Sequence, residues 1–152
     1  MLRAQITDTY KDAMRKKDER VVATVRLVMA ELKKRDIDAR PKIGDAGISE
    51  DEILGMLQGM IKQRRESIEL YQKGNRADLV KQESDEIAVI ERFLPKQLSE
   101  QEMKDAVAKT VTAIGAASIK DMGKVMAELK KNYAGQMDFA KVGPLVKEKL
   151  GG

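Results

Sequence analysis

The sequence contains no cysteine, no histidine and no tryptophan. Without cysteine there is no disulfide, no thiol nucleophile and no thiolate metal site. Without histidine, the commonest general base and the commonest zinc ligand are also absent. Much of the side-chain chemistry that enzymes use is therefore excluded, and we expect a protein without a cofactor or a metal that is not itself an enzyme.

Aromatic residues and long hydrophobic runs are also scarce. Phe, Tyr and Trp make up 3% of the 152 residues, while aliphatic residues, Met, Lys and Glu are abundant, which is typical of helices rather than sheets. No apolar run approaches the roughly 20 residues that span a bilayer, and the first residues, MLRAQITDTYKD, do not resemble a signal peptide. We therefore predict an all-α, cytoplasmic protein.

Apolar residues recur every three or four positions over residues 2–17 and again over residues 21–37. This spacing predicts two amphipathic helices, the second ending near Ile37. The following segment, ARPKIGDAG (residues 39–47), contains Pro41, Gly44 and Gly47 without any helical period, so it is predicted to be an exposed loop.

The sequence SEDE at residues 49–52 matches a capping box, in which Ser49 accepts from the amide of Glu52 and begins a third helix. A metal site is an alternative interpretation of these acids, but acidic residues in a first turn normally complement the helix dipole. The third helix is predicted to reach Lys73, with Gly74 ending it and Asn75 capping a fourth helix. The short break predicts an antiparallel hairpin.

Three charged residues fall on the apolar faces of this hairpin: Arg64 on the third helix, and Glu83 and Glu86 on the fourth. In a hairpin that turns at residues 74 and 75, facing residues have numbers that sum to about 150, which places Arg64 opposite Glu86. We predict a structural ion pair between them. The alternative, a partly buried Arg64 that binds phosphate, is less common when a carboxylate lies opposite.

The stretch ERFLPKQLSEQE (residues 91–102) ends one helix and begins another. Pro95 is incompatible with a continuing helix, and Ser99 and Glu102 form a second capping box. We therefore predict an N-terminal helical bundle of about four helices over residues 1–94 and a C-terminal three-helix bundle over residues 95–152. In the latter, helices are expected after Ser99, from Ser118 to Gly135, and from Asp138 to near Leu150.

Charge is distributed unevenly between these subdomains. Residues 1–94 carry 19 basic and 18 acidic residues, including all ten Arg, whereas residues 95–152 carry ten Lys against seven acids. On the predicted sixth helix, Lys120, Lys124 and Lys131 fall within about 40° of each other at 100° per residue. Lys130 and Lys147 are additional candidates for RNA contact.

Two interpretations of these lysines remain open. Aligned lysines are common on the solvated face of an amphipathic helix, which is the simpler interpretation. The alternative is a face that follows RNA phosphates. Because no Arg and few aromatic residues accompany the lysines, such a face would recognise backbone or shape rather than stack on bases.

No catalytic or nucleotide-binding motif is present. The chain lacks GxxxxGK[ST], and Gly123-Lys124 lies inside a predicted helix. Ser49, Ser99 and Ser118 are interpreted as helix caps rather than nucleophiles, since no histidine can activate them. The sequence therefore offers no catalytic, cofactor-binding or metal-binding residue.

Five segments carry a family resemblance: VRLVMAELKKRDID (residues 25–38), ILGMLQGMIKQRRESIELYQKGNRADLVKQE (53–83), ERFLPKQLSEQE (91–102), KDMGKVMAELKKNYAGQMD (120–138) and LVKEKL (145–150). With them the chain resembles the GatB/YqeY family over nearly its whole length. The resemblance implies an all-helical protein in two subdomains, similar to the tail of the B subunit of the tRNA-dependent amidotransferase. That enzyme converts misacylated Glu-tRNA or Asp-tRNA to the amide form, using ATP and ammonia from glutamine. Met137 and the Gly143-Pro144 pair depart from the family pattern.

In that amidotransferase the tail holds the tRNA body while other domains and subunits perform the chemistry. The resemblance therefore implies a non-catalytic tRNA-binding accessory module. An alternative is a protein adaptor that docks through apolar and Met-rich faces onto an amidotransferase or an aminoacyl-tRNA synthetase. Carbon-nitrogen ligase activity with glutamine as the amido donor is a third hypothesis, implied by the family alone.

Overall fold

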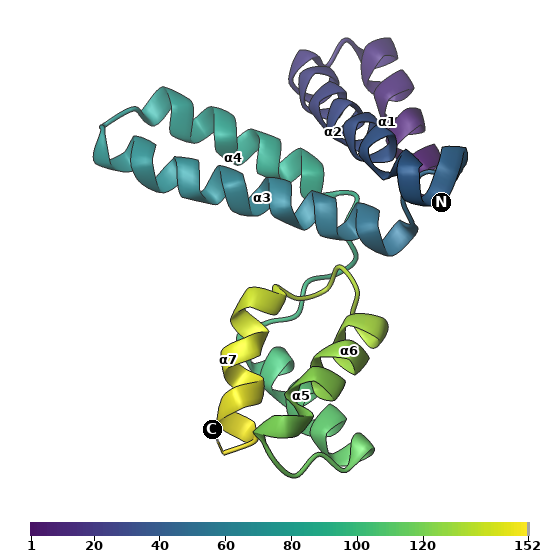
Figure 1. Cartoon of the computed structure of the whole chain (residues 1–152). Coiled ribbons are helices and arrows are strands. Elements are labelled where there is room, and N and C mark those ends of the chain that lie inside the picture. The colour runs from purple at the N-terminus through teal and green to yellow at the C-terminus, as the bar shows by residue number, and fades with distance from the viewer. Residues whose placement is uncertain (152) are drawn as a thin grey trace. The chain divides into compact units, whose positions relative to one another are not determined.

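The computed structural model describes residues 1–151, and this part of the chain contains helices and no strand (Figure 1). The prediction of an all-α fold is confirmed. Tertiary contacts divide the chain into two compact units, an N-terminal unit of Met1–Leu94 and a C-terminal unit of Pro95–Gly152. The elements in chain order are α1 (Leu2–Lys16), α2 (Glu19–Ile43), the 3₁₀ turn η1 (Gly44–Ala46), α3 (Glu50–Lys73), α4 (Ala77–Glu91), α5 (Glu100–Ile114), the 3₁₀ turn η2 (Ile119–Asp121), α6 (Met122–Asn132) and α7 (Phe139–Lys149).

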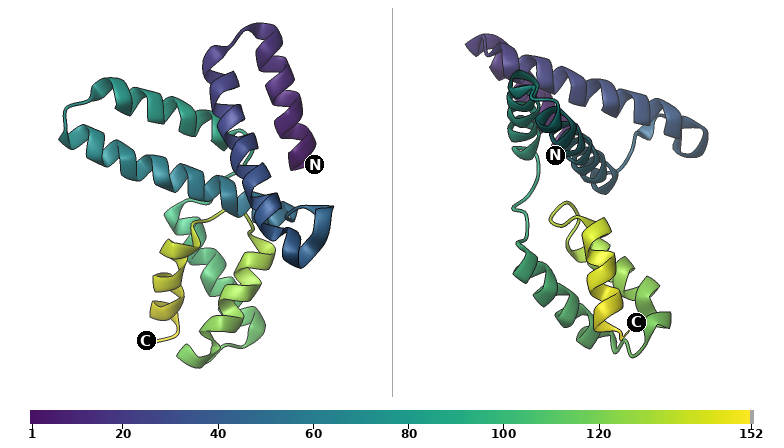
Figure 2. Two further views of the ribbon diagram at one scale, coloured as in Figure 1. Left: turned by 45° about the horizontal axis from the view of Figure 1, so that its top comes forward. Right: turned by 90° about the vertical axis from the view of Figure 1, so that its left-hand side faces the viewer.

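The N-terminal unit consists of two antiparallel hairpins that share one core. Helices α1 and α2 form the first hairpin, and α3 and α4 lie side by side as the second (Figures 1 and 2). The long α2 also packs against α4. Their apolar faces meet at fully buried side chains, among them Ile6, Val25, Val28, Ile53, Met56, Leu57 and Ile90.

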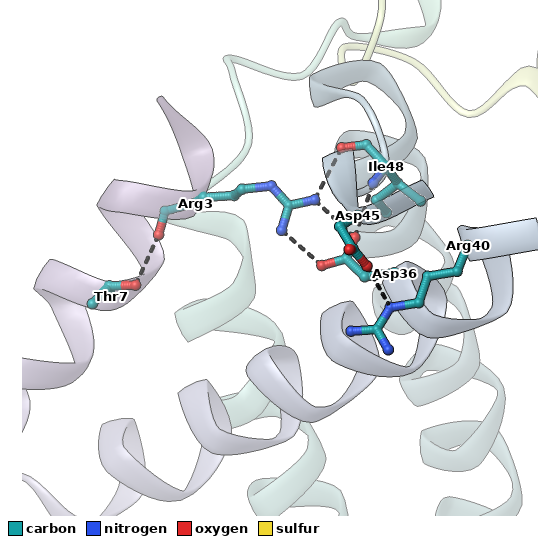
Figure 3. Close-up of polar contacts among 6 residues, drawn as sticks. All are labelled: Arg3, Thr7, Asp36, Arg40, Asp45 and Ile48. Carbon is teal, nitrogen blue, oxygen red and sulfur yellow. Dashed lines mark hydrogen bonds and ion pairs between the residues drawn. The ribbon is translucent and has the colours of Figure 1, made fainter. Parts of the chain in front are cut away.

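A cluster of polar contacts ties the beginning of α1 to the end of α2 (Figure 3). The Arg3 guanidinium donates from Nη1 and Nη2 to the two carboxylate oxygens of Asp36, each at 2.8 Å, and Nη2 also donates to the carbonyl of Ile48 at 3.0 Å. Asp36 in turn accepts from the backbone N–H of Ile48 at 2.9 Å. We call Arg3, Asp36 and Ile48 the Arg3 clasp; it connects α1, α2 and the segment that begins α3.

The prediction of an exposed loop over residues 39–47 is partly wrong, because α2 continues through Pro41 to Ile43. Proline removes one backbone donor and with it the hydrogen bond to the carbonyl four residues earlier, but near the end of a 25-residue helix the loss of one bond does not end it. The helix ends at Gly44, which has a φ of 68° and whose N–H donates to the carbonyl of Arg40. Only η1 and three residues follow before α3.

The prediction that Asn75 caps α4 is also wrong. Helix α3 ends at Lys73 as expected, but Asn75 has a φ of 55° and forms the left-handed residue of the turn, so Arg76 precedes α4. Asparagine tolerates this conformation better than most residues. The Arg76 guanidinium then pairs with Asp78 in the first turn of α4, with Nε to Oδ1 at 3.2 Å and Nη2 to Oδ2 at 3.1 Å.

The C-terminal unit is a bundle of α5, α6 and α7 around its own core, which contains Val107, Val125, Leu129, Met137, Val142 and Val146. The capping box of Ser99 and Glu102 begins α5 as predicted, and Gly115 ends α5 in a left-handed conformation. Asp138 accepts from the amide of Ala140 and caps α7, in agreement with the prediction. Met137, which departs from the family pattern, is 1% exposed and fills this core.

Candidate nucleic-acid interface

The apolar side of α6 faces the core of the C-terminal unit. Val125 and Leu129 have no exposed surface, and Met122, Met126 and Tyr133 pack around them. Since α6 contacts both α5 and α7, only its opposite side is open to solvent. That side carries the lysines singled out from the sequence.

The segment before α6 has a different geometry from the one expected. Ser118 and Asp121 form the predicted capping box, but they cap the 3₁₀ turn η2, and α6 begins only at Met122 and ends at Asn132. Lys120 therefore lies in a 3₁₀ turn, where the advance of 100° per residue does not apply. Of the three lysines predicted to share one helical face, only Lys124 and Lys131 therefore lie on α6.

The Asp121 carboxylate accepts from the amides of Ala117 at 3.0 Å and Ser118 at 3.3 Å. These two hydrogen bonds, and to a smaller extent the charge of Lys124, lower the pKa of Asp121 below its ordinary value. The cap therefore remains ionised at neutral pH and places a fixed negative charge near the start of the lysine-bearing face.

Lys124 and Lys131 are exposed and lie seven residues apart on one face of α6. Glu128 lies about 40° from Lys124 at 100° per residue, on the same face, and its carboxylate accepts from Asn132 Nδ2 at 3.2 Å. Sequence reasoning missed this residue, although its position four residues after Lys124 was a sufficient signal. The face is therefore of mixed charge rather than purely basic.

Lys130 and Lys147 lie apart from this face. Lys130 points to the beginning of α7, where its Nζ lies 6.0 Å from the centre of the Phe139 ring, and Lys147 is exposed near the end of α7. Among the described residues, none of the five candidate lysines (Lys120, Lys124, Lys130, Lys131 and Lys147) is within ion-pair distance of a carboxylate. Their ammonium groups are available to phosphates.

Arg64, the other candidate for phosphate binding, is occupied within the α3–α4 hairpin. Its Nε donates to Glu86 Oε2 at 2.8 Å, Glu83 Oε2 lies 4.0 Å away, and Nη1 donates to the carbonyl of Met60 at 3.2 Å. The side chains of Arg64 and Glu86 are 12% and 11% exposed. Burial, and then the charge of Glu86, raise the pKa of Glu83. The ion pair expected from the hairpin register is present, and the Nε and Nη1 donors of this guanidinium are occupied within the hairpin.

The acidic first turn of α3 has structural partners. Ser49 caps α3 by accepting from the amide of Glu52 at 3.2 Å, and Glu50 Oε1 accepts from the amide of Leu2 at 2.8 Å and lies 3.8 Å from the N-terminal ammonium. Within residues 1–151, no group of three or more acidic side chains is arranged to hold a metal ion. No helix in the same range is long and apolar enough to cross a lipid bilayer.

Comparison with known proteins identifies the family. The model of the YqeY-like protein family matches residues 3–150. The chain belongs to this family.

Its relatives include two mitochondrial proteins that are both named Altered inheritance of mitochondria protein 41. The protein from Lachancea thermotolerans is 32% identical to this chain over 113 residues, and the one from Vanderwaltozyma polyspora is 31% identical over 118 residues. These alignments cover 73% and 74% of this chain but only 58% and 62% of the relatives. An uncharacterized protein of Schizosaccharomyces pombe is 28% identical over 98 residues, which cover 64% of this chain and 76% of that protein.

Proposed function

We propose that this YqeY-like protein is a non-catalytic tRNA-binding module that contacts the phosphate backbone through η2, α6 and α7. The observation that supports this proposal most directly is the set of five exposed lysines on these elements, none of which forms an ion pair with a carboxylate in the described residues. Lysine is a compact point charge that binds phosphate without requiring a fixed approach angle. The backbone of a folded tRNA offers such phosphates in abundance.

The mixed charge of the α6 face favours a partner with a defined three-dimensional structure. Asp121 and Glu128 lie beside Lys124, so an arbitrary polyanion gains little net attraction from this face. A folded RNA that places its phosphates over Lys124 and Lys131, away from the two carboxylates, gains more electrostatic attraction than an arbitrary polyanion does. No Arg lies in residues 95–152, and this composition favours backbone and shape recognition over contacts with bases.

The test is fluorescence anisotropy with a labelled folded tRNA and with an unstructured RNA of equal length. We expect tighter binding to the tRNA and a loss of that binding when Lys120, Lys124 and Lys131 are all replaced by Gln. A matched control replaces the exposed Lys11, Lys33 and Lys73 of the N-terminal unit by Gln, which removes the same charge elsewhere. Equal binding of both RNAs, or equal losses in the two triple variants, contradicts the proposal.

The proposal assigns no chemistry to this chain, because the sequence offers no residue suited to carry it. Amide formation by the purified protein, supplied with glutamine, ATP and a misacylated tRNA, would contradict this and revive the carbon-nitrogen ligase hypothesis. Action in the cytoplasm is part of the proposal. Four yeast relatives carry a mitochondrial name, so location is tested separately by fractionation of cells.

A further inference from the structure

A groove runs between residues 27–43 of α2 and residues 52–66 of α3 in the N-terminal unit. Helix α2 crosses the α3–α4 pair rather than following it (Figure 2). The crossing leaves two adjoining hollows of about 570 and 710 Å³, which share Glu31, Lys34 and Arg35 along their common wall. Both hollows lie within this one unit, and we call them together the α2–α3 groove.

The α3 wall of this groove has two glycines, Gly55 and Gly59, one turn apart. A Cβ atom added at either position would meet no heavy atom within 4 Å. Packing within the chain therefore does not require glycine here, and the missing side chains leave room for a second backbone to approach. Two exposed aliphatic residues, Leu27 (46% exposed) and Ile43 (43% exposed), lie at opposite ends of the α2 wall.

The groove is lined by charges of both signs, with carboxylates at its two ends and lysines in its middle. The end of the groove near η1 carries Asp38, Glu52 and Lys42. The middle of the groove carries Lys34 and Lys62, and the far end carries Glu66. All six side chains are exposed, and none has an ion-pair partner among the described residues. The three free carboxylates balance the three free lysines, so the groove offers a polyanion such as RNA no net attraction, whereas a peptide with charges of both signs can complement it.

We propose that the α2–α3 groove binds an amphipathic helix of another protein, with small residues over Gly55 and Gly59, an acidic middle and a basic residue near each end. Leu27 and Ile43 then contact an apolar side chain at either end of that helix. The wall from Leu27 to Ile43 is about 24 Å long at 1.5 Å per residue, which matches a partner helix of about 16 residues. This inference concerns the N-terminal unit and does not depend on the tRNA-binding proposal.

The experiment uses the full chain and two stapled helical peptides of about 16 residues that are sequence isomers. Both carry Ala toward the groove and Leu near each end. In the first, two Glu occupy the middle and a Lys lies near each end; in the second, the Lys and Glu positions are exchanged. Binding is measured by fluorescence anisotropy, and we expect the first peptide to bind at least about tenfold more tightly than the second.

Variants of the protein locate the binding. Gly59→Leu fills the groove and should abolish binding of the first peptide. Gly123→Leu is the matched control, because Gly123 is an exposed helical glycine with equally open surroundings in α6. The double variant Lys34→Glu/Lys62→Glu alters only exposed side chains, so it retains the fold, and it should reverse the preference between the two peptides.

Four results would overturn the inference: equal binding of the isomers, no binding of either, unchanged preference in the Lys34→Glu/Lys62→Glu variant, or displacement of the first peptide by single-stranded RNA. A fifth is self-association of the wild-type chain that Gly59→Leu abolishes, since the groove would then hold a second copy. Because the lysines tested for tRNA binding lie in the other unit, failure of this inference leaves that proposal intact.

Discussion

Single residues explain how the N-terminal unit is held together. In the Arg3 clasp, the Asp36 carboxylate on α2 accepts hydrogen bonds from Arg3 on α1 and from Ile48 before α3. The hydrogen bond from Arg3 has the largest effect and the one from the Ile48 amide a smaller one, and together they lower the pKa of Asp36 to about 2. A carboxyl group in an unfolded chain has a pKa of about 3.9. Ionised Asp36 therefore favours the folded state above that value, and its contribution is lost as the pH falls toward the folded pKa.

The first prediction concerns this pH dependence. Asp36→Asn should lower the free energy of unfolding at pH 7 by about 1 to 2 kcal/mol, a value reduced for partial solvent exposure of the clasp. Between about pH 5 and pH 2 the difference between wild type and variant should shrink, because Asp36 becomes protonated in the wild type. Urea unfolding followed by circular dichroism measures both. A difference that stays constant over this range would show that Asp36 does not titrate as described.

A second prediction concerns the buried ion pair of the α3–α4 hairpin. Arg64→Met leaves Glu86, whose side chain is 11% exposed, without its cation and should lower the stability by about 3 kcal/mol. The double variant Arg64→Met/Glu86→Gln should recover most of this loss, since only Glu83, whose side chain is 19% exposed, then keeps an unpaired charge at the position. Both are measured by thermal unfolding.

The same Arg64→Met variant distinguishes the structural interpretation from phosphate binding. Because the guanidinium is occupied by Glu86 and Met60, tRNA affinity should be unchanged at a temperature where the variant is folded. A large loss of affinity in the folded variant would show that Arg64 contacts RNA.

At the scale of the elements, local signals in the sequence located most helix beginnings. Ser49, Ser99 and Asp138 accept the backbone hydrogen bonds that begin α3, α5 and α7, since a cap depends only on neighbouring residues. Ser118 caps the 3₁₀ turn η2 rather than α6. Helix ends were harder to predict from the sequence. Proline and glycine in residues 39–47 suggested a loop, but α2 continues through Pro41. The 3₁₀ turn at Lys120 and the left-handed Asn75 were also missed, because several conformations are compatible with each of these sequences.

The third prediction contrasts glycines within and before α3. Gly55→Ala and Gly59→Ala should each raise the stability by about 1 kcal/mol, because alanine favours a helix interior and its Cβ meets nothing. Gly47→Ala should be destabilising, since Gly47 has a φ of 80° and an added Cβ would collide with the Arg3 guanidinium. Thermal denaturation of the three variants compares them. A decrease in melting temperature for Gly55→Ala or Gly59→Ala similar to that of Gly47→Ala would contradict the description of an open groove.

At the scale of the whole molecule, two cores with no shared residue underlie the division at Pro95. The sequence signalled this division through one proline and one capping box, and it signalled the Arg64–Glu86 pair through the register of a hairpin. The helical period was also sufficient to place Glu128 beside Lys124, but the prediction for this face named only its lysines. The α2–α3 groove depends on how two helices cross, which is determined by tertiary packing and not by any local pattern.

The central claim is that lysines of η2 and α6 contact tRNA phosphates, and its most direct test is the salt dependence of tRNA binding. The logarithm of the association constant is measured against the logarithm of the salt concentration for wild type, for the Lys120, Lys124 and Lys131 triple Gln variant, and for the Lys11, Lys33 and Lys73 control. If each of the first three lysines contacts a phosphate, the slope should decrease by about three in the first variant and stay unchanged in the control. An unchanged slope in the first variant would contradict the assignment of this face to RNA.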